Sequence, residues 1–554
     1  MLLLNLNLLA TAPGGVARLR ELILTLAVQG KLVPQDPTDE PASKLLKKIR
    51  AEKDRLISDK KIRRSKPLDT INDSECSFVL PGSWEWERLG NLGDWGAGAT
   101  PSRTNSNYYG GQIPWFKSGE LTADFISESE ETVTDAALCE CSLRLNQVGD
   151  VLIAMYGATI GKTAILSIVA TTNQAVCACT PFAGLTNTYL LLLMKALKPY
   201  FISIGEGGAQ PNISREKVVA TVVGLPPLAE QSRIVTRVEE LMRLCDALEA
   251  KGQLQATQHA QLVSTLLGTL TQSETPEQLA ENWHRIATHF DLLLDRPQAI
   301  DALEQTIFGL AMRGLLVAQD SSDESATEVL KRIARRQKNP VKSIESASGA
   351  NEEVPFSLPT SWAWCNVAQI ATVGLGGTPA RHESSYWNGT IPWVSSGEVA
   401  NGRISDTKEK ITQAGLANSN AKVYPKNTVL IAMIGQGKTR GQSALLDIEA
   451  CTNQNVAGLV LEQGAANPDY IFLWARHEYV RTRSGGRGGA QPALNGAIVR
   501  SLKVPLPPLA EQFRIITRVA QLRRLCADLR QRLSVGQITQ AQLAEALIEE
   551  VFSS

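Results

Sequence analysis

The stretch Leu225-Pro226-Pro227-Leu228-Ala229-Glu230-Gln231 recurs as Leu506-Pro507-Pro508-Leu509-Ala510-Glu511-Gln512 in the second half of this 554-residue chain. The match continues beyond the motif, since 17 of the 24 positions in Leu225–Leu248 are identical in Leu506–Leu529. Upstream, Ile113-Pro114-Trp115 recurs as Ile391-Pro392-Trp393. A tandem duplication of this length predicts two similar lobes with pseudo-twofold geometry. It indicates bipartite binding before it indicates catalysis.

Each copy of the repeated motif leads into a helix whose apolar residues alternate spacings of four and three. The positions are Ile234, Val238, Leu241, Cys245 and Leu248 in the first helix, and Ile515, Val519, Leu522, Cys526 and Leu529 in the second. This heptad seam predicts burial of a narrow apolar stripe against another helix. We expect the two seams to pack against each other as an antiparallel, coiled-coil-like pair. A helix of about 40 residues spans roughly 60 Å.

The remaining sequence predicts an α+β protein in which two similar globular domains are separated by these long helices. In each half, a helical region and a charged linker precede a strand-rich region, and runs such as Val151–Met155 and Val429–Met433 are typical of buried strands. The predicted parts are an N-terminal helical region at 1–74, a globular domain at 75–224, a long helix at 225–272, a helical region repeating the N-terminus at 273–345, a second globular domain at 346–505 and a long helix at 506–554.

Charge and cysteine content restrict the classes of partner. Lys plus Arg is 56 and Asp plus Glu is 56, so no overall basic field indicates a nucleic-acid partner, and any such partner must meet locally segregated charge. The pairs Cys139/Cys141 and Cys177/Cys179 lack a second ligand pair or a nearby histidine. We therefore expect the nine cysteines to be small buried residues in a reducing cytosol rather than zinc ligands.

The N-terminal leucines do not have the pattern of a secretory signal. No basic segment precedes them, asparagines interrupt them, and Leu8-Leu9 through Pro13 recurs as Leu292-Leu293 through Pro297, so we expect folded protein here. No apolar run is long enough to span a bilayer, and we expect a cytoplasmic protein without membrane contact.

Gly161-Lys162-Thr163 and Gly437-Lys438-Thr439 each follow a predicted strand and suggest a nucleotide-binding P-loop. Their spacing argues against it, because Tyr156 and Ala432 stand where a P-loop needs its first glycine. We expect polar loops that touch phosphate through Lys162 or Lys438. Five histidines without a repeated pattern give no support to a catalytic pair, so the sequence predicts a recognition protein without an active site.

Polar, aromatic and basic residues interleave in the loops of both lobes, as expected for contacts to phosphates and base edges. The candidates are Arg103, Tyr108, Tyr109, Lys117, Ser118, Lys162 and Thr163 in the first lobe, and Arg381, His382, Tyr386, Trp387, Lys438, Arg440 and Arg487 in the second. For any one of them, a solvated loop side chain is an equally good interpretation. Trp115 and Trp393 are expected to be core anchors. Because Glu120–Gly149 and Val399–Asn427 barely match, one scaffold is expected to present two specificities.

Over essentially its whole length, the chain resembles the specificity subunit of type I restriction-modification enzymes. The resemblance rests on Leu-Pro-Pro-Leu-Ala-Glu-Gln twice, on Gly-Gly-Ala-Gln-Pro at 207–211 and 488–492, and on the repeated Ile-Pro-Trp, Ser-Gly-Glu and Gly-Lys-Thr frames. The order of these motifs, present in both halves, is specific to the family.

The resemblance implies that each globular domain is a target recognition domain reading one part of a split, asymmetric site in double-stranded DNA. The long helices would set the unread spacer and dock two modification subunits, which bring S-adenosylmethionine and methylate adenine at N6. Two restriction subunits, where present, would add ATP- and Mg-dependent translocation and cleavage in host defence. The chain itself would hold no cofactor and no catalytic residue.

Two other interpretations stay open at this point. A bilobal adaptor holding two protein ligands explains the duplication and the neutral charge, but not the basic and aromatic loops in both lobes. A nucleotide-driven enzyme would use the Gly-Lys-Thr loops, and ATP binding by the purified chain would distinguish it.

Overall fold

The computed structural model describes residues 11–64, 66–206, 211–336, 355–434, 439–484 and 494–553. The N-terminal leucines, both Gly-Gly-Ala-Gln stretches, Lys438 and Arg487 lie outside the described residues. The chain forms two compact units, Met1–Leu254 with Gln537–Ser554, and Gln255–Gly536. The finer six-part division stays a prediction.

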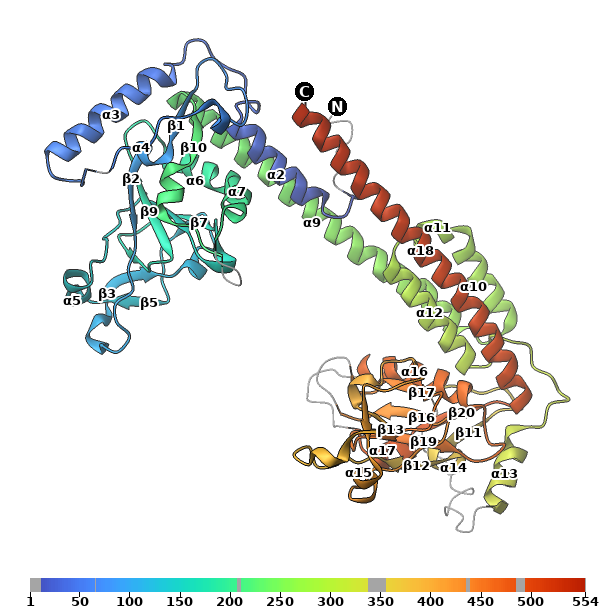
Figure 1. The fold of residues 1–554 in the computed structure, drawn as a ribbon. Helices are drawn as coiled ribbons and strands as arrows, with labels where there is room; N and C mark the ends of the chain where they lie inside the picture. The colour runs from blue at the N-terminus through green and yellow to red at the C-terminus, as the bar shows by residue number, and fades with distance from the viewer. Residues whose placement is uncertain are drawn as a thin grey trace. The chain divides into compact units, whose positions relative to one another are not determined.

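The globular part of each unit contains the same three sheets (Figure 1). In the first unit the strand orders are β2 (Gly93–Ala97), β9 (Val176–Pro181), β6 (Val151–Ala154), β7 (Thr163–Leu166) and β4 (Phe125–Ile126); β5 (Glu131–Val133), β3 (Tyr109–Phe116) and β8 (Thr171–Thr172); and β1 (Glu85–Arg88) with β10 (Val222–Leu225). The second unit repeats them as β12 (Ala371–Leu375), β19 (Val456–Leu461), β16 (Val429–Ala432), β17 (Ser443–Leu446) and β14 (Arg403–Ile404); β15 (Glu409–Ile411), β13 (Trp387–Val394) and β18 (Cys451–Thr452); and β11 (Ala363–Asn366) with β20 (Lys503–Leu506). The α+β fold with a duplicated domain is confirmed.

The central strands of the larger sheets are those that the sequence predicted. Every side chain of β6 and β16 is buried, which explains why both read as continuous apolar runs without alternation. Both strands pair antiparallel with two neighbours, β6 with β7 and β9, and β16 with β17 and β19. The two predicted strands are therefore the centres of the two lobes.

Helices surround these sheets and connect them to the scaffold. Those of the first unit are α2 (Gly15–Val28), α3 (Ala42–Ser58), α4 (Leu89–Leu92), α5 (Asp135–Glu140), α6 (Asn187–Ala196), α7 (Lys198–Ser203) and α8 (Arg215–Ala220). Those of the second unit are α10 (Pro276–Thr288), α11 (Phe290–Leu293), α12 (Pro297–Met312), α13 (Ala326–Arg336), α14 (Val367–Ile370), α15 (Gln413–Ala417), α16 (Pro468–Ser484) and α17 (Gly496–Ser501). The long helices α9 (Leu228–Gln272) and α18 (Leu509–Ser553) have 45 residues each and contribute to both units.

The prediction that the long helices run antiparallel is confirmed, because the first part of each helix shares a core with the last part of the other. The finer prediction that the two heptad seams pack against each other is wrong. Ile234, Val238 and Cys245 of α9 share a core with Leu22 and Ile23 of α2. The corresponding residues of α18, namely Ile515, Val519 and Cys526, share a separate core with residues of α12. Each shorter helix carries its own apolar stripe, so each seam is covered by the helix of its own half and has no free face for the other seam.

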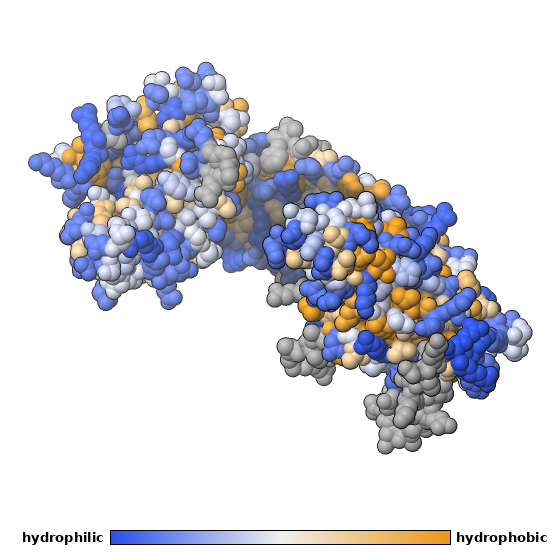
Figure 2. Space-filling model, turned by 60° about the horizontal axis from the view of Figure 1, so that its bottom comes forward, coloured by the Kyte–Doolittle hydropathy of each residue, from blue (hydrophilic) through white to orange (hydrophobic). Residues whose placement is uncertain are grey.

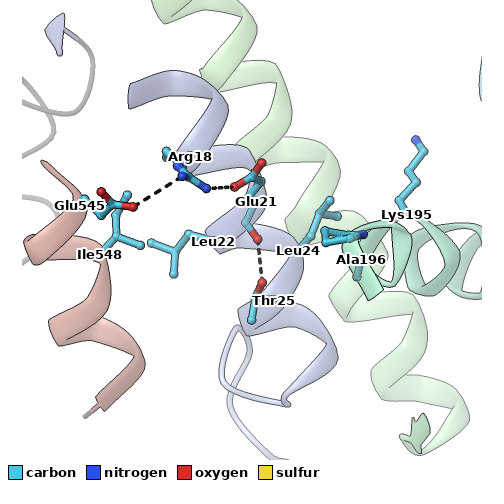
Figure 3. Close-up of a pocket in the computed structure, with 10 residues that line it drawn as sticks. Arg18, Glu21, Leu22, Leu24, Thr25, Lys195, Ala196, Glu545 and Ile548 are labelled. Carbon is cyan, nitrogen blue, oxygen red and sulfur yellow. Dashed lines mark hydrogen bonds and ion pairs between the residues drawn. The ribbon is translucent and has the colours of Figure 1, made fainter. Parts of the chain in front are cut away.

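The far end of the other long helix completes each of these cores. Ala544 and Ile548 of α18 join the core of α2, where Glu545 also meets Arg18 (Figure 3). Val263 and Leu267 of α9 join the core of α12 in the same way. Each unit therefore contains the first part of one long helix and the last part of the other.

The repeated Glu-Gln of the opening motif fixes each long helix to its globular domain. Glu230 is fully buried and accepts hydrogen bonds from Trp84 Nε1 (3.0 Å) and Gln35 Nε2 (2.6 Å). Gln231 accepts from the Thr186 amide (2.9 Å) at the start of α6. Glu511 repeats the first contacts with Trp362 (3.0 Å) and Gln319 (2.7 Å), and Gln512 accepts from the Asn467 amide (2.7 Å).

The prediction that the cysteines are buried is correct for six of the nine. Cys177, Cys179, Cys245, Cys365, Cys451 and Cys526 are buried, whereas Cys76 and Cys141 are half-buried and Cys139 is exposed. Within the described ranges, no helix has the length and apolar character needed to cross a membrane.

Removing the buried carboxylate should destabilise the first unit. Glu230→Ala leaves the buried indole N–H of Trp84 without an acceptor and removes the hydrogen bond from the exposed Gln35. We expect the free energy of unfolding in urea to fall by about 2–3 kcal/mol, against less than about 1 kcal/mol for Glu230→Gln. Burial raises the pKa of Glu230, although the hydrogen bonds from Trp84 and Gln35 oppose this. The stabilisation that this carboxyl provides is therefore complete below its unfolded pKa and is lost as pH rises through its folded pKa. The free energy of unfolding of the wild type, relative to that of Glu230→Gln, should accordingly be higher at about pH 4 than at about pH 7. Equal losses in the Ala and Gln variants would contradict the assignment.

Candidate nucleic-acid interface

An arginine in the loop before β3 is sandwiched between aromatic rings and an acid. The Arg103 guanidinium lies 4.5 Å from the ring centre of Tyr109 and 5.3 Å from that of Trp115. It pairs with Glu131 on β5 (2.6 Å), and the hydrogen bond lowers the pKa of Glu131. Arg103 thus connects its own loop to β3 and to β5, and 54% of its side chain is still exposed.

The second lobe repeats this arrangement. Arg381 lies 4.0 Å from the ring centre of Trp387 and 5.0 Å from that of Trp393, and it pairs with Glu409 on β15. In both lobes the arginine precedes its acid by 28 residues. The sequence reasoning selected both arginines but missed Glu131 and Glu409, which a comparison of the two halves at that offset would have found. Because the two lobes differ in loop sequence but share this arrangement, we interpret Arg103 with Glu131, and Arg381 with Glu409, as a structural feature of both lobes and call it the arginine support.

The tryptophans beneath these arginines are core anchors, as predicted. Trp115 and Trp393 are each 1% exposed. Trp115 Nε1 donates to the carbonyl of Ala99 (3.1 Å), and Trp393 Nε1 donates to that of Gly377 (3.0 Å).

Other predicted contacts differ between the lobes. Lys117 lies between Glu130 (2.7 Å) and Glu131 (3.2 Å), whereas Ser395 takes its place in the second lobe. Tyr108 donates to Glu140 (2.8 Å), and Ser118 begins the short turn Ser118–Glu120. In the second lobe His382 is exposed and Tyr386 half-buried. The structure thus brings Arg103 and Lys117 together on Glu131, whereas Tyr108 is bound to Glu140 of α5.

The two Gly-Lys-Thr motifs are not structural equivalents, which corrects the sequence comparison. The Gly161 amide donates to the carbonyl of Ala154 (2.9 Å), and in the second lobe it is the Gly441 amide that donates to Ala432 (2.8 Å). Lys162 and Thr163 therefore correspond to Gln442 and Ser443. The hairpin has five residues between Met155 and Gly161 but seven between Met433 and Gly441, so the second hairpin is two residues longer.

The first of these loops borders a cavity of about 670 Å³ in the first unit. Lys162, Lys195 and Lys198 line it, and Lys195 pairs with Asp124 at 2.5 Å. Thr163 is 7% exposed at the start of β7. In the second lobe, Arg440 belongs to the longer hairpin loop.

A family model described as "Type I restriction modification DNA specificity domain" matches the chain twice, over residues 81–258 and 359–535. The chain belongs to the type I restriction-modification specificity family. It is 33% identical to the Type I restriction enzyme EcoAI specificity subunit of Escherichia coli, covering 97% of this chain and 93% of that protein. It is 32% identical to the EcoEI specificity subunit of the same species over the same shares. A solved chain from a study of complex assembly and conformational transition of the type I R-M system shares 16% identity and covers 86% of this chain and 99% of its own, with a TM-score of 0.47.

Membership confirms the resemblance and makes the chain a specificity subunit, the recognition component and not the catalytic one. Both family matches begin just before β1 or β11 and continue through the globular lobe into the following long helix. The lobe and the first part of its long helix are therefore one recurring unit of the family.

The shared arginine support should contribute to the stability of each lobe. Arg381→Ala removes an ion pair and two ring contacts, and we expect about 1–2 kcal/mol lower stability of the second unit, with Arg381→Lys losing less. Thermal unfolding followed by tryptophan fluorescence measures this, and His382→Ala is the control because His382 is exposed beside it. If Arg381→Ala were as stable as His382→Ala, the ion pair and ring contacts of Arg381 would not contribute to the stability of the lobe.

Proposed function

We propose that residues 75–224 and 346–505 are two target recognition domains, each reading one part of a split, asymmetric DNA site. The observation that carries the proposal is the repeated family match, one for each lobe. The same three sheets in both lobes supply a common frame, and the loops on that frame differ in sequence. A protein built for a symmetric site would need one lobe type only.

Differences at equivalent positions of the frame supply different chemistry for base edges and phosphates. Lys117 and Lys162 in the first lobe become Ser395 and Gln442 in the second, where the longer loop adds Arg440. Lysine offers a cation, whereas serine and glutamine offer neutral donors and acceptors that suit different base edges. We assign DNA contact to Arg103, Tyr108, Lys117, Ser118 and Lys162, and to Arg381, His382, Tyr386, Lys438, Arg440 and Arg487.

The long helices are proposed to set the spacer and to dock two modification subunits. Both helices expose large apolar side chains at equivalent places, Leu244 (59% exposed) on α9 and Leu525 (58%) on α18. Leu262 and Leu543 form a second such pair. Apolar residues also reach the surface among hydrophilic ones on the face drawn in Figure 2. Repeated exposure of this kind fits two copies of one partner.

The chemistry of the complex is assigned to the partner subunits. S-adenosylmethionine belongs to the modification subunits, and ATP and Mg belong to restriction subunits where these are present. This chain supplies position on the DNA. The neutral net charge fits this division, because partner subunits can supply much of the charge that neutralises phosphates.

Mapping of adenine methylation tests the proposed reading of a split site. Cells expressing the chain with its modification subunit should show methylation at one motif with two unlike parts, detected by single-molecule sequencing. Replacing residues 346–505 by the same region of a relative should change one part of the motif and leave the other. An intact complex that methylates no split motif would favour the bilobal adaptor instead.

Acidic substitution of the repeated leucines tests docking. Leu244→Asp or Leu525→Asp should remove about one of two modification subunits, and the double variant both, because a buried unpaired carboxylate is costly at an interface. Native mass spectrometry of the purified complex gives the stoichiometry. Val79→Asp is the matched control, since Val79 is 92% exposed and lies outside the long helices. Unchanged stoichiometry in the double variant would exclude this surface.

A further inference from the structure

The helices α2 and α12 occupy the same place in their units but carry opposite charges at one position. Arg20 stands seven residues before Ala27, and Glu304 stands seven residues before Ala311 in the recurring Ala-to-Gly stretch. Both side chains face the first part of the long helix in their own unit. The charges of their partners on the long helices are opposite as well.

In the first unit, Arg20 binds two acids of α9. Its Nη2 lies 2.6 Å from Asp246 Oδ1 and 3.2 Å from Glu249 Oε2. The hydrogen bond to Asp246 raises the pKa of Arg20, although burial opposes this.

In the second unit, Glu304 accepts from two arginines of α18. Arg523 Nε lies 2.7 Å from one carboxylate oxygen, and Arg530 Nη2 lies 2.8 Å from the other. Arg476 of α16 approaches to 3.7 Å, and Arg530 also pairs with Asp301 at 2.6 Å. The Glu304 side chain is 10% exposed, and these arginines keep its pKa below the ordinary value although burial alone would raise it.

One partner on each long helix occupies an equivalent position. Glu249 follows Glu230 by 19 residues, as Arg530 follows Glu511. The ion pair Arg20–Glu249 of the first unit is thus Glu304–Arg530 in the second, with both charges inverted. The other partners have no charged equivalent, because Arg523 corresponds to Met242 and Asp246 corresponds to Ala527.

The apolar seams of the two long helices do not distinguish the two halves. Ile234, Val238 and Cys245 are matched by the same residue types at Ile515, Val519 and Cys526. An apolar seam of identical composition would accept either short helix, and repeat proteins are prone to such misassembly. The short helices differ at some apolar positions, since Leu22 and Leu24 are matched by Thr306 and Phe308, and they differ in the sign of the charge at Arg20 and Glu304.

We propose that the inverted ion pairs are a pairing code that directs α2 to α9 and α12 to α18, and that rejects the exchanged pairs within one chain or between two copies. In an exchanged pair, Arg20 would face Arg523 and Arg530. Glu304 would face Asp246 and Glu249 and would lose every cation of α18. Like charges at close range are repulsive, and a buried carboxylate without a cation is especially unfavourable.

Co-purification of two differently tagged copies of the full chain tests the code. Arg20→Glu should repel its native partners and attract Arg523 and Arg530 of another copy. We expect recovery of the second tag with the first to rise about threefold or more over wild type. Arg20→Gln is the control, because it loses the native ion pair without gaining an attraction, so its recovery should stay near the wild-type level.

Two results would overturn the proposal. Wild-type recovery with Arg20→Glu would mean that the charges do not select the partner, and equal increases with Glu and Gln would mean that simple weakening of the native pair suffices. Glu304→Arg, compared with Glu304→Gln, repeats the test from the second unit. Arg20 is the safer position for folding because its side chain is 29% exposed, against 10% for Glu304.

Discussion

One buried carboxylate in each half determines how a long helix leaves its globular domain. Glu230 joins the first turn of α9 to an indole near β1 and to an amide from the segment after α2, and the neighbouring Gln231 joins it to the start of α6. Three separate segments therefore meet at two consecutive residues. Because burial makes both residues costly unless every polar atom is paired, the helix can take only the direction that satisfies them. The packing of α2 on the heptad seam of α9 follows from that direction.

Comparison of the two halves separates the structural contacts, which are repeated, from the loop residues that differ between the lobes. The carboxylate junctions, the buried tryptophans and the arginine supports recur with matching partners in both lobes. Loop length at the β6–β7 and β16–β17 hairpins, and the residues at Lys117 and Ser395, do not recur. A frame of this kind lets one lobe acquire a new loop without disturbing the other, because the contacts of each frame lie within one unit.

Comparison of the two halves of the sequence predicted the central strands, the long helices and the anchoring tryptophans, since each is written twice in the same residue types. It could not predict which helix covers a seam, because α2, α9 and α18 all carry apolar stripes and periodicity does not name the partner. It mispaired Gly437 with Gly161, because identical letters outweighed a two-residue insertion that only hydrogen bonding reveals. The candidate interface was predicted in part: arginines suited to DNA are equally suited to ion pairs, and Arg103 and Arg381 form them.

The closing of each helical core by the far end of the other long helix has a consequence during synthesis. The core around α2 needs Ala544 and Ile548, which leave the ribosome after the whole second lobe. At roughly 5–20 residues per second, this core stays incomplete for on the order of tens of seconds after its own lobe has been made. The nascent first half therefore presents an open apolar surface throughout that interval, and chaperone demand should be set by the order of translation rather than by the final stability.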